Sequence, residues 1–357
     1  MLPDVKRFAG PPAGPRRPPP APPAPAGPRR PRRPPPATPA PALITSVAGM
    51  SFATEITVTG PLRTPAQMLA HQEVDGHASV HDTDTAASVG LAGAPIEGPT
   101  HFSQFDPLAY LVWGPDWFAR GCISSHFQNM VFEGEQVQAS LTVSGQGSAR
   151  IEAHKADGTP VLTGTGSVGP DHAQTELEAR RVAQGAPGDL FVIDQLEVGM
   201  RGRHETVAID FATSNGALYP FSLGEKLAQI TEPHPWYTEA GGPSSPWGRP
   251  VVPIEMISVI TNRSGDQWPV RSPSLGLFLD LEIRLINGPV LVGQEYALDR
   301  EIVGLGQSRR TESYWTRTTL SDIDSGQPVV AVLLHSGVFK ESYPGYPKER
   351  LASKQSK

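Results

Sequence analysis

Cysteine and long apolar runs are what this sequence has least of. Cys122 is the single cysteine among 357 residues, so no intramolecular disulfide and no cysteine-based zinc site can form. Its neighbours hold no group that would activate the thiol, so we expect a small buried side chain. No apolar run reaches membrane-spanning length and no secretory signal is present, so we expect no membrane segment and a cytoplasmic location.

The fingerprints of common cofactor and metal sites are also missing. The sequence has no Walker loop, no dinucleotide-binding fingerprint and no nucleophile elbow, so we expect no cofactor. Asp75, His77, His81 and Asp82 are suitable metal ligands by residue type. Their spacing fits no standard zinc signature, so we expect no metal.

The N-terminal residues differ in composition from the rest of the chain. Residues 1–42 hold 17 of the 39 prolines, a composition that cannot bury enough apolar surface to order itself, so we predict a disordered tail over residues 1–49. Two interpretations stay open. The tail is a polyproline or Arg-rich binding arm, or it is a nonfunctional extension that precedes a true start at Met50.

Charge in the remaining body argues against nucleic acid as a partner. Residues 1–49 contain 8 of the 30 basic residues and 1 of the 36 acidic ones, which leaves 22 against 35 and a formal net charge of −13. Such a balance is a poor footprint for a polyanion. We therefore expect a small-molecule partner, and a homo-oligomeric assembly stays open.

The chemistry-bearing side chains gather between Val74 and Phe105. This stretch runs through a Gly/Pro-rich turn at Gly98-Pro99-Thr100 into a mostly apolar segment, which predicts a helix that Pro107 ends or kinks. Residues 124–169 then show extended runs separated by glycine-containing turns and by the hairpin signal Asp157-Gly158.

The second half repeats this order of elements. Four anchors recur at offsets of 155 to 168 residues: Asp75 to Ala78 with Glu232 to Pro235, Pro95-Ile96 with Pro250-Val251, Gly134 to Val137 with Gly293 to Tyr296, and Asp157 to Val161 with Ser325 to Val329. A repeat in constant order indicates a duplicated domain. Strands grouped after a helix predict an α+β fold in which a curled antiparallel sheet wraps the helix.

We therefore predict two tandem domains that pack as an internal pseudo-dimer. The predicted boundaries are residues 50–170 for the first domain, 171–190 for a linker, 191–345 for the second domain and 346–357 for a tail.

The stretch from Val74 to Phe105 resembles the MaoC-like, R-specific enoyl-CoA hydratases of hotdog fold, and the duplication resembles their double-hotdog members. Asp75 falls on the family's catalytic Asp, His77 on its Asn, Ala78 on its Pro and Val80 on its catalytic His. Because Val80 cannot move a proton, His81 or His77 would have to supply the imidazole.

Downstream matches keep register with the same hallmark. They are Asp82, Ala86, Gly90-Leu91, Pro95-Ile96 and Glu97-Gly98, the last with one residue missing from the family's His-Gly turn. In the second half Glu232 and His234 echo the Asp and Asn positions, and Tyr237 falls where the His should be.

The resemblance implies a hydratase or dehydratase on enoyl or 3-hydroxyacyl thioesters of CoA or acyl carrier protein. It implies Asp75 with His77 or His81 as the water-activating pair, and backbone N–H groups around Gly98 and Thr100 as donors to the thioester oxygen. His101 has two interpretations, a substrate-binding group or a hydrogen-bonded core residue. Asp82 has two as well, an acid–base group or a helix-start carboxylate.

Two other functions stay open from the sequence. One is a thioesterase of the same fold. The other is a non-catalytic acyl-binding or assembly protein, which the Val80 and Tyr237 replacements favour. A shared fold does not decide between them.

Overall fold

Alternating side chains build the strands of a large antiparallel sheet in the computed structural model, which describes residues 55–145, 147–264 and 268–352. In β5 (Val137–Gly145), Val137, Ala139 and Leu141 are buried whereas Gln138 is exposed, as expected when successive side chains point to opposite faces. Every described residue belongs to one unit, Thr54–Lys357. The predicted tail at 1–49 and the start at Met50 lie outside the described residues.

The described strands form one ten-stranded sheet in the order β1-β5-β6-β7-β4-β9-β12-β11-β10-β8. The first half supplies β1 (Ile56–Thr59), β4 (Gly121–Phe127), β5, β6 (Ser148–Lys155) and β7 (Pro160–Val168). The second half supplies β8 (Glu205–Val207), β9 (Gly276–Leu285), β10 (Tyr296–Gln307), β11 (Thr311–Asp322) and β12 (Pro328–Phe339). The predicted α+β fold with antiparallel strands is confirmed.

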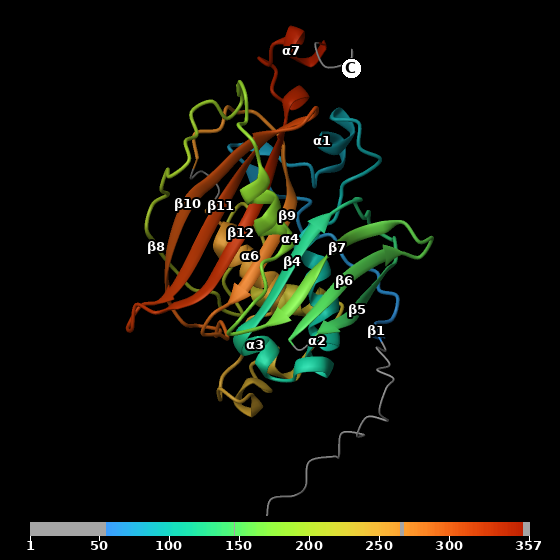
Figure 1. Cartoon of the computed structure of the whole chain (residues 1–357), viewed down its shortest axis with the longest axis vertical. Coiled ribbons are helices and arrows are strands. Elements are labelled where there is room, and N and C mark those ends of the chain that lie inside the picture. The colour runs from blue at the N-terminus through green and yellow to red at the C-terminus, as the bar shows by residue number, and fades with distance from the viewer. Residues whose placement is uncertain (1–54, 146, 265–267, 353–357) are drawn as a thin grey trace, which may run out of the picture. The chain divides into compact units, whose positions relative to one another are not determined.

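The two halves have the same strand order, read from the centre of the sheet outward. They meet where β4 pairs with β9, for example Ile123 with Ile283, and the strand colours in Figure 1 change there from green to orange. Equivalent hydrogen bonds fix the correspondence: Ile96 N–H to Val131 O in one half matches Val252 N–H to Val290 O in the other. Ile96 therefore matches Val252 rather than Val251, a one-residue correction to the anchor drawn from sequence.

The central helix of the first half has two parts. The 3₁₀ helix η1 (Gly98–Phe105) continues into α2 (Asp106–Trp113), and Pro107 occupies the first turn of α2, where its missing N–H costs nothing. The helix continues past Pro107 to Trp113, so the prediction that Pro107 ends it is wrong, and the helix type changes at Asp106 instead. The second half has one central helix, α6 (Ile254–Asn262), preceded by Pro253.

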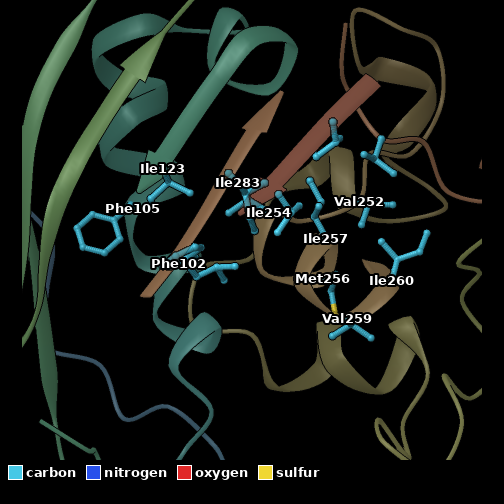
Figure 2. Close-up of a cluster of buried hydrophobic side chains, with 14 of the residues drawn as sticks. Phe102, Phe105, Ile123, Val252, Ile254, Met256, Ile257, Val259, Ile260 and Ile283 are labelled. Atoms are coloured by element: carbon cyan, nitrogen blue, oxygen red, sulfur yellow. The ribbon is translucent and has the colours of Figure 1, made fainter. Parts of the chain in front are cut away.

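The two central helices and the joined strands share one core. Figure 2 shows Phe102 and Phe105 of η1, side chains of α6, and Ile123 and Ile283 of the central strands in a single cluster. Because this core crosses the boundary between the halves, the two share their hydrophobic stabilisation.

The region predicted as a linker, 171–190, contains the helix α4 (Glu176–Ala183), which begins at a Thr175 cap. Thr175 and Arg180 contact Glu282 and Asp280 of β9, whereas the neighbouring Leu281 belongs to the core that α6 shares. Alternate strand residues face opposite sides, so α4 and α6 cover opposite faces of the sheet.

The remaining elements are short. They are β2 (Glu73–Val74) and β3 (His77–Ala78) in a separate two-stranded sheet, α1 (Thr83–Ser88), α3 (Asp116–Arg120), α5 (Leu223–Gln229), η2 (Pro235–Tyr237), η3 (Gly242–Ser244), η4 (Lys340–Ser342) and α7 (Lys348–Ala352), which falls in the predicted 346–357 tail.

Candidate active site

The hairpin of β2 and β3 carries Asp75 at its turn. Val74 pairs with His77, so Asp75 and Gly76 are the two turn residues, and their φ angles are 49° and 77°. Positive φ at both positions is what a type I′ turn requires, and Asp-Gly is a favoured pair for it. The Asp75 side chain is exposed and is not among the residues that line the cavity described below.

His81 has a fixed orientation. Its Nδ1 lies 2.6 Å from the Pro95 carbonyl oxygen, and because that oxygen can only accept, Nδ1 carries the proton and Nε2 is left as the basic nitrogen. Burial lowers the pKa of His81 below its usual range, although the Pro95 hydrogen bond acts in the opposite direction. The imidazole is therefore neutral near pH 7, as a general base must be.

His77 is less well oriented. Its Nδ1 lies 2.9 Å from the carbonyl oxygen of its own neighbour, Ala78. Its Nε2 is buried without a hydrogen-bond partner among the described residues. A buried nitrogen of this kind leaves room for a ligand contact.

Both histidines line a cavity of about 420 Å³ between the two halves. The first half contributes His77, Val80, His81, Glu97, Gly98, His101 and Phe127, and the second half contributes Tyr219, Tyr314 and mostly apolar side chains of β9 and β12. The structure thus brings together four of the residues proposed from sequence: His77, His81, Gly98 and His101. A largely apolar cavity with a few polar groups is the usual form of a small-molecule site.

Gly98 begins the central helix at the cavity wall. A Cβ at this position would lie 2.7 Å from the Phe127 ring, so only glycine allows the backbone to approach the ring. The Gly98 N–H takes part in no hydrogen bond among the described residues, and it lies at the positive end of the helix dipole. The Thr100 N–H, in contrast, donates to the Glu97 carbonyl, and Thr100 does not line the cavity.

Glu97 is a cavity residue that sequence reasoning did not select. Its Oε1 accepts a 3.0 Å hydrogen bond from the Tyr219 hydroxyl. Burial raises the pKa of Glu97 to about 7, against the lowering effects of the Lys226 charge and of Tyr219. Its place directly before Gly98, in the stretch matched to the family's His-Gly turn, was the available signal.

Behind this wall lies a buried charged cluster. Lys226 Nζ of α5 lies 3.3 Å from Glu255 Oε2 of α6 and 3.4 Å from Thr100 Oγ1. Burial raises the pKa of Glu255 to about 7. Burial also lowers the pKa of His101 to about 4, and His101 Nδ1 has no hydrogen-bond partner among the described residues. His101 is therefore neutral and is not a satisfied core histidine.

Three other proposed residues have hydrogen-bond partners and do not line the cavity. Asp82 caps α1 by accepting from the Thr85 N–H at 2.8 Å. Glu232 accepts two hydrogen bonds from Arg63, at 2.5 and 3.0 Å. His234 accepts from the Trp236 N–H at the start of η2.

Tyr237 also has a partner, in the core of the first half. It donates to Asp106 Oδ2 at 2.6 Å, and Trp117 Nε1 donates to Oδ1 at 2.8 Å. Both Tyr237 and Asp106 are buried, and the Tyr237 ring lies 6.0 Å from the Phe118 ring between centroids.

The region of the second half that corresponds to the cavity is nearly filled. The equivalent backbone bonds place Ile254 at the position of Gly98 and Ile257 at the position of His101. The remaining space, lined by these two and by side chains such as Trp117, Phe118 and Val290, is about 10 Å³. Only the first of the two equivalent positions holds a cavity that a substrate could enter.

The described residues lack the features of two other kinds of site. None of their helices has the length and apolar character needed to cross a membrane. They also contain no group of three His, Cys, Asp or Glu side chains placed to hold a metal ion.

Comparison with known proteins gives matches in structure. No family model matches the sequence, and no curated protein sequence matches it. A MaoC domain protein from Chloroflexus aurantiacus, named as a dehydratase, matches with a TM-score of 0.52 and 15% identity over 81% of this chain and 95% of that one. The chain therefore has the fold of that protein, and the resemblance to MaoC-like hotdog proteins is confirmed for the fold.

Two further matches have lower TM-scores. A conserved hypothetical protein from Mycobacterium tuberculosis with a double hotdog fold gives 0.49 at 14% identity, over 81% of this chain and 97% of that one. The dehydratase domain of PpsC from the same organism, solved with an acyl-CoA, gives 0.41 at 12% identity, over 80% and 94% of the two chains.

Proposed function

We propose that this chain is a hydratase or dehydratase of enoyl and 3-hydroxyacyl thioesters, built as an internal pseudo-dimer with one working site in its first half. One observation carries the proposal. The imidazole of His81, with Nε2 as its basic nitrogen, and the Gly98 N–H, which donates no hydrogen bond among the described residues, lie in the wall of one apolar cavity. The fold shared with a protein named as a dehydratase supports it, although fold alone does not fix a reaction.

Each group has a role that its environment suits. Neutral His81 removes the proton from Cα in the dehydration direction, and the protonated imidazole returns a proton to Cα in hydration. The Gly98 N–H donates to the thioester carbonyl oxygen as enolate charge develops there, and the helix dipole adds to this effect. The apolar side chains of β9 and β12 receive the acyl chain. The carrier, CoA or acyl carrier protein, would remain at the opening.

The test uses the full chain with a panel of trans-2-enoyl-CoA substrates. The reaction is followed by the decrease in absorbance of the conjugated thioester, and the products are identified by mass spectrometry. We expect the addition of one water, and we expect His81→Gln to lower turnover by roughly 100-fold or more while the binding of a saturated acyl-CoA is kept. Free thiol as the product would instead show a thioesterase, and binding without turnover would show an acyl-binding protein.

Asp75→Asn tests the assignment made from sequence. Asn-Gly forms the type I′ turn as well as Asp-Gly does, and the Asp75 side chain lies outside the cavity wall. We therefore expect turnover within about threefold of the parent, since exposed substitutions of this kind usually have small effects. A loss as large as that of His81→Gln would return Asp75 to the site.

A further inference from the structure

The carboxyl group in the cavity wall is that of Glu97. It is the residue directly before Gly98, and it follows Pro95, whose carbonyl orients His81, by two positions. Tyr219, from the second half, fixes one of its oxygens at 3.0 Å. Glu97 is only partly buried by its residue surface, as expected for a side chain that faces a cavity.

The charged and titratable groups that line the cavity with Glu97 are His77, His81, His101, Tyr219, Arg300 and Tyr314. The guanidinium of Arg300 is paired with Glu205 at 3.0 Å. Lys226 of α5 lowers the pKa of Glu97, and so does the hydroxyl of Tyr219. Glu255 of α6 shares Lys226 with it. His81 and His101 line the same cavity, and both are neutral because burial lowers the pKa of each. One ammonium thus faces two carboxyl groups, so one of the two carboxyls tends to keep its proton.

We propose that Glu97 is the catalytic carboxyl partner of His81, in the role that the sequence pattern assigned to Asp75. This inference rests on the proposed thioester dehydration and hydration. Two titratable groups in one cavity, an imidazole held neutral and a carboxyl held partly protonated, form an acid–base pair.

The dehydration step balances with these two groups alone. His81 Nε2 takes the proton from Cα, and the electron pair of that C–H bond forms the enolate, whose oxygen accepts from Gly98. The protonated Glu97 then gives its proton to the β-hydroxyl group, the Cβ–O bond breaks, and water leaves as the Cα–Cβ double bond forms. The proton on His81 returns to Glu97 through water, which restores both groups.

The second half provides an internal comparison. At the position equivalent to Glu97 it has Pro253, and at that of Gly98 it has Ile254. The carboxyl and the cavity therefore occur together in the first half and are both missing from the corresponding position in the described second half.

The test compares Glu97→Gln with Glu255→Gln in the full chain. Glutamine keeps the shape of the side chain and can still accept from Tyr219, so we expect Glu97→Gln to bind hexanoyl-CoA within about threefold of the parent. We expect its turnover of trans-2-enoyl-CoA to fall by about 100-fold or more, with kcat affected rather than KM. Glu255 is a buried carboxyl outside the cavity wall, and its pKa is also raised to about 7, so the turnover of its variant should stay within about fivefold of the parent.

The pH profile gives a second readout. With a 3-hydroxyacyl-CoA as the substrate, the parent should lose dehydration activity as pH rises through about 7, the pKa of Glu97, because the protonated carboxyl that the step needs is lost. In the Glu255→Gln variant Lys226 no longer has Glu255 as a charged partner, so it lowers the pKa of Glu97 further. The loss of dehydration activity should then occur at a lower pH than in the parent.

The failures are distinguishable. A folded parent that binds hexanoyl-CoA but turns over no substrate overturns the proposed function, and the role of Glu97 with it. A parent that turns over substrate together with a Glu97→Gln variant of equal rate overturns the role of Glu97 alone. A variant that no longer binds hexanoyl-CoA would give Glu97 a structural role instead and also overturn the inference.

Discussion

The equivalent positions in the two halves have opposite contents. The first holds a cavity of about 420 Å³ and the second a space of about 10 Å³, although the backbone hydrogen bonds around them correspond. The difference comes from a few side chains. Gly98 and His101 on one helix are replaced by Ile254 and Ile257 on the other, and bulkier apolar groups fill the space that glycine leaves open.

Aromatic side chains also pack next to the filled position, and one of them, Phe118, lines the remaining space. His234 lies 4.8 Å from Trp236 and 5.5 Å from Phe118 between ring centroids, and Tyr237 reaches Asp106 across the halves. Such contacts contribute packing and a buried hydrogen bond. The filled position therefore adds packing to the core that the halves share, and the other position holds the cavity.

The largest expected effect comes from a substitution that makes the position with the cavity, at Gly98, resemble the filled position at Ile254. Gly98→Ala places a methyl group 2.7 Å from the Phe127 ring, so the helix start or the ring must shift. Because a displacement of about 1 Å at a reacting group can cost 100-fold in rate, we expect turnover to fall by roughly that factor.

A second substitution tests the cause of that loss. The Gln128 N–H donates to Val161 O as the Ile286 N–H donates to Val329 O, so Leu285 lies at the position equivalent to Phe127. Phe127→Leu should therefore relieve the contact and restore part of the turnover in the Gly98→Ala background. Rates measured on the single and double variants check this. Unchanged turnover in Gly98→Ala would mean that the close approach of helix and ring is not required.

The next effect concerns the filled position alone. The Ile257 side chain is 1% exposed, so Ile257→Ala leaves a cavity in the core. We expect the free energy of unfolding to fall by about 2–5 kcal/mol. Urea unfolding measures the loss. Turnover at temperatures where the variant stays folded should not change, and a gain of activity would contradict the placement of the site at the other position.

The smallest expected effect concerns Asp106, a carboxyl whose pKa is raised as that of Glu97 is. Burial raises the pKa of Asp106 to about 7, against the hydrogen bonds from Tyr237 and Trp117. A folded-state pKa above the unfolded value of about 3.9 gives stability that is full below pH 4 and is lost as pH rises through 7. In the Asp106→Asn variant, the decline of the free energy of unfolding between pH 4 and pH 7 should therefore be smaller by roughly 2–4 kcal/mol.

Unfolding measured from pH 4 to 8 checks the slope, and enoyl-CoA turnover provides the comparison with Glu97. Asparagine can keep accepting from Trp117, so we expect the rate to stay within a few fold of the parent. An Asp106→Asn variant with an unchanged slope would show that Asp106 is ionised in the folded chain at low pH.

Local features of the fold were readable in the sequence. Asp157-Gly158 predicted a hairpin, and β6 and β7 form it, with Gly158 at φ 86°. The apolar segment after Gly98 predicted the central helix, and the extended runs within residues 124–169 predicted strands such as β5. These signals depend on a few neighbouring residues, so no knowledge of the rest of the chain is needed.

Residues 64–72 carry a local helix signal, with Thr64 suited to the N-cap and Pro65 to the first helical position. They form no helix in the structure. The Gln67 side chain instead accepts from the Leu69 N–H and donates to the Pro95 carbonyl. The contact with Pro95 comes from a distant segment. Tertiary contacts of this kind override weak local propensity.

The sequence by itself determined the element order, the duplication and the likeness to MaoC-like hotdog proteins. Only the tertiary structure decided which carboxyl reaches the cavity. Asp75 has the right spacing from His77 and His81, but the type I′ turn takes it to an exposed hairpin end. Glu97 meets Tyr219, 122 residues away, only because the halves pack together. Side chains that meet across such separations are selected by packing and burial, and neither is written in the spacing of neighbouring residues.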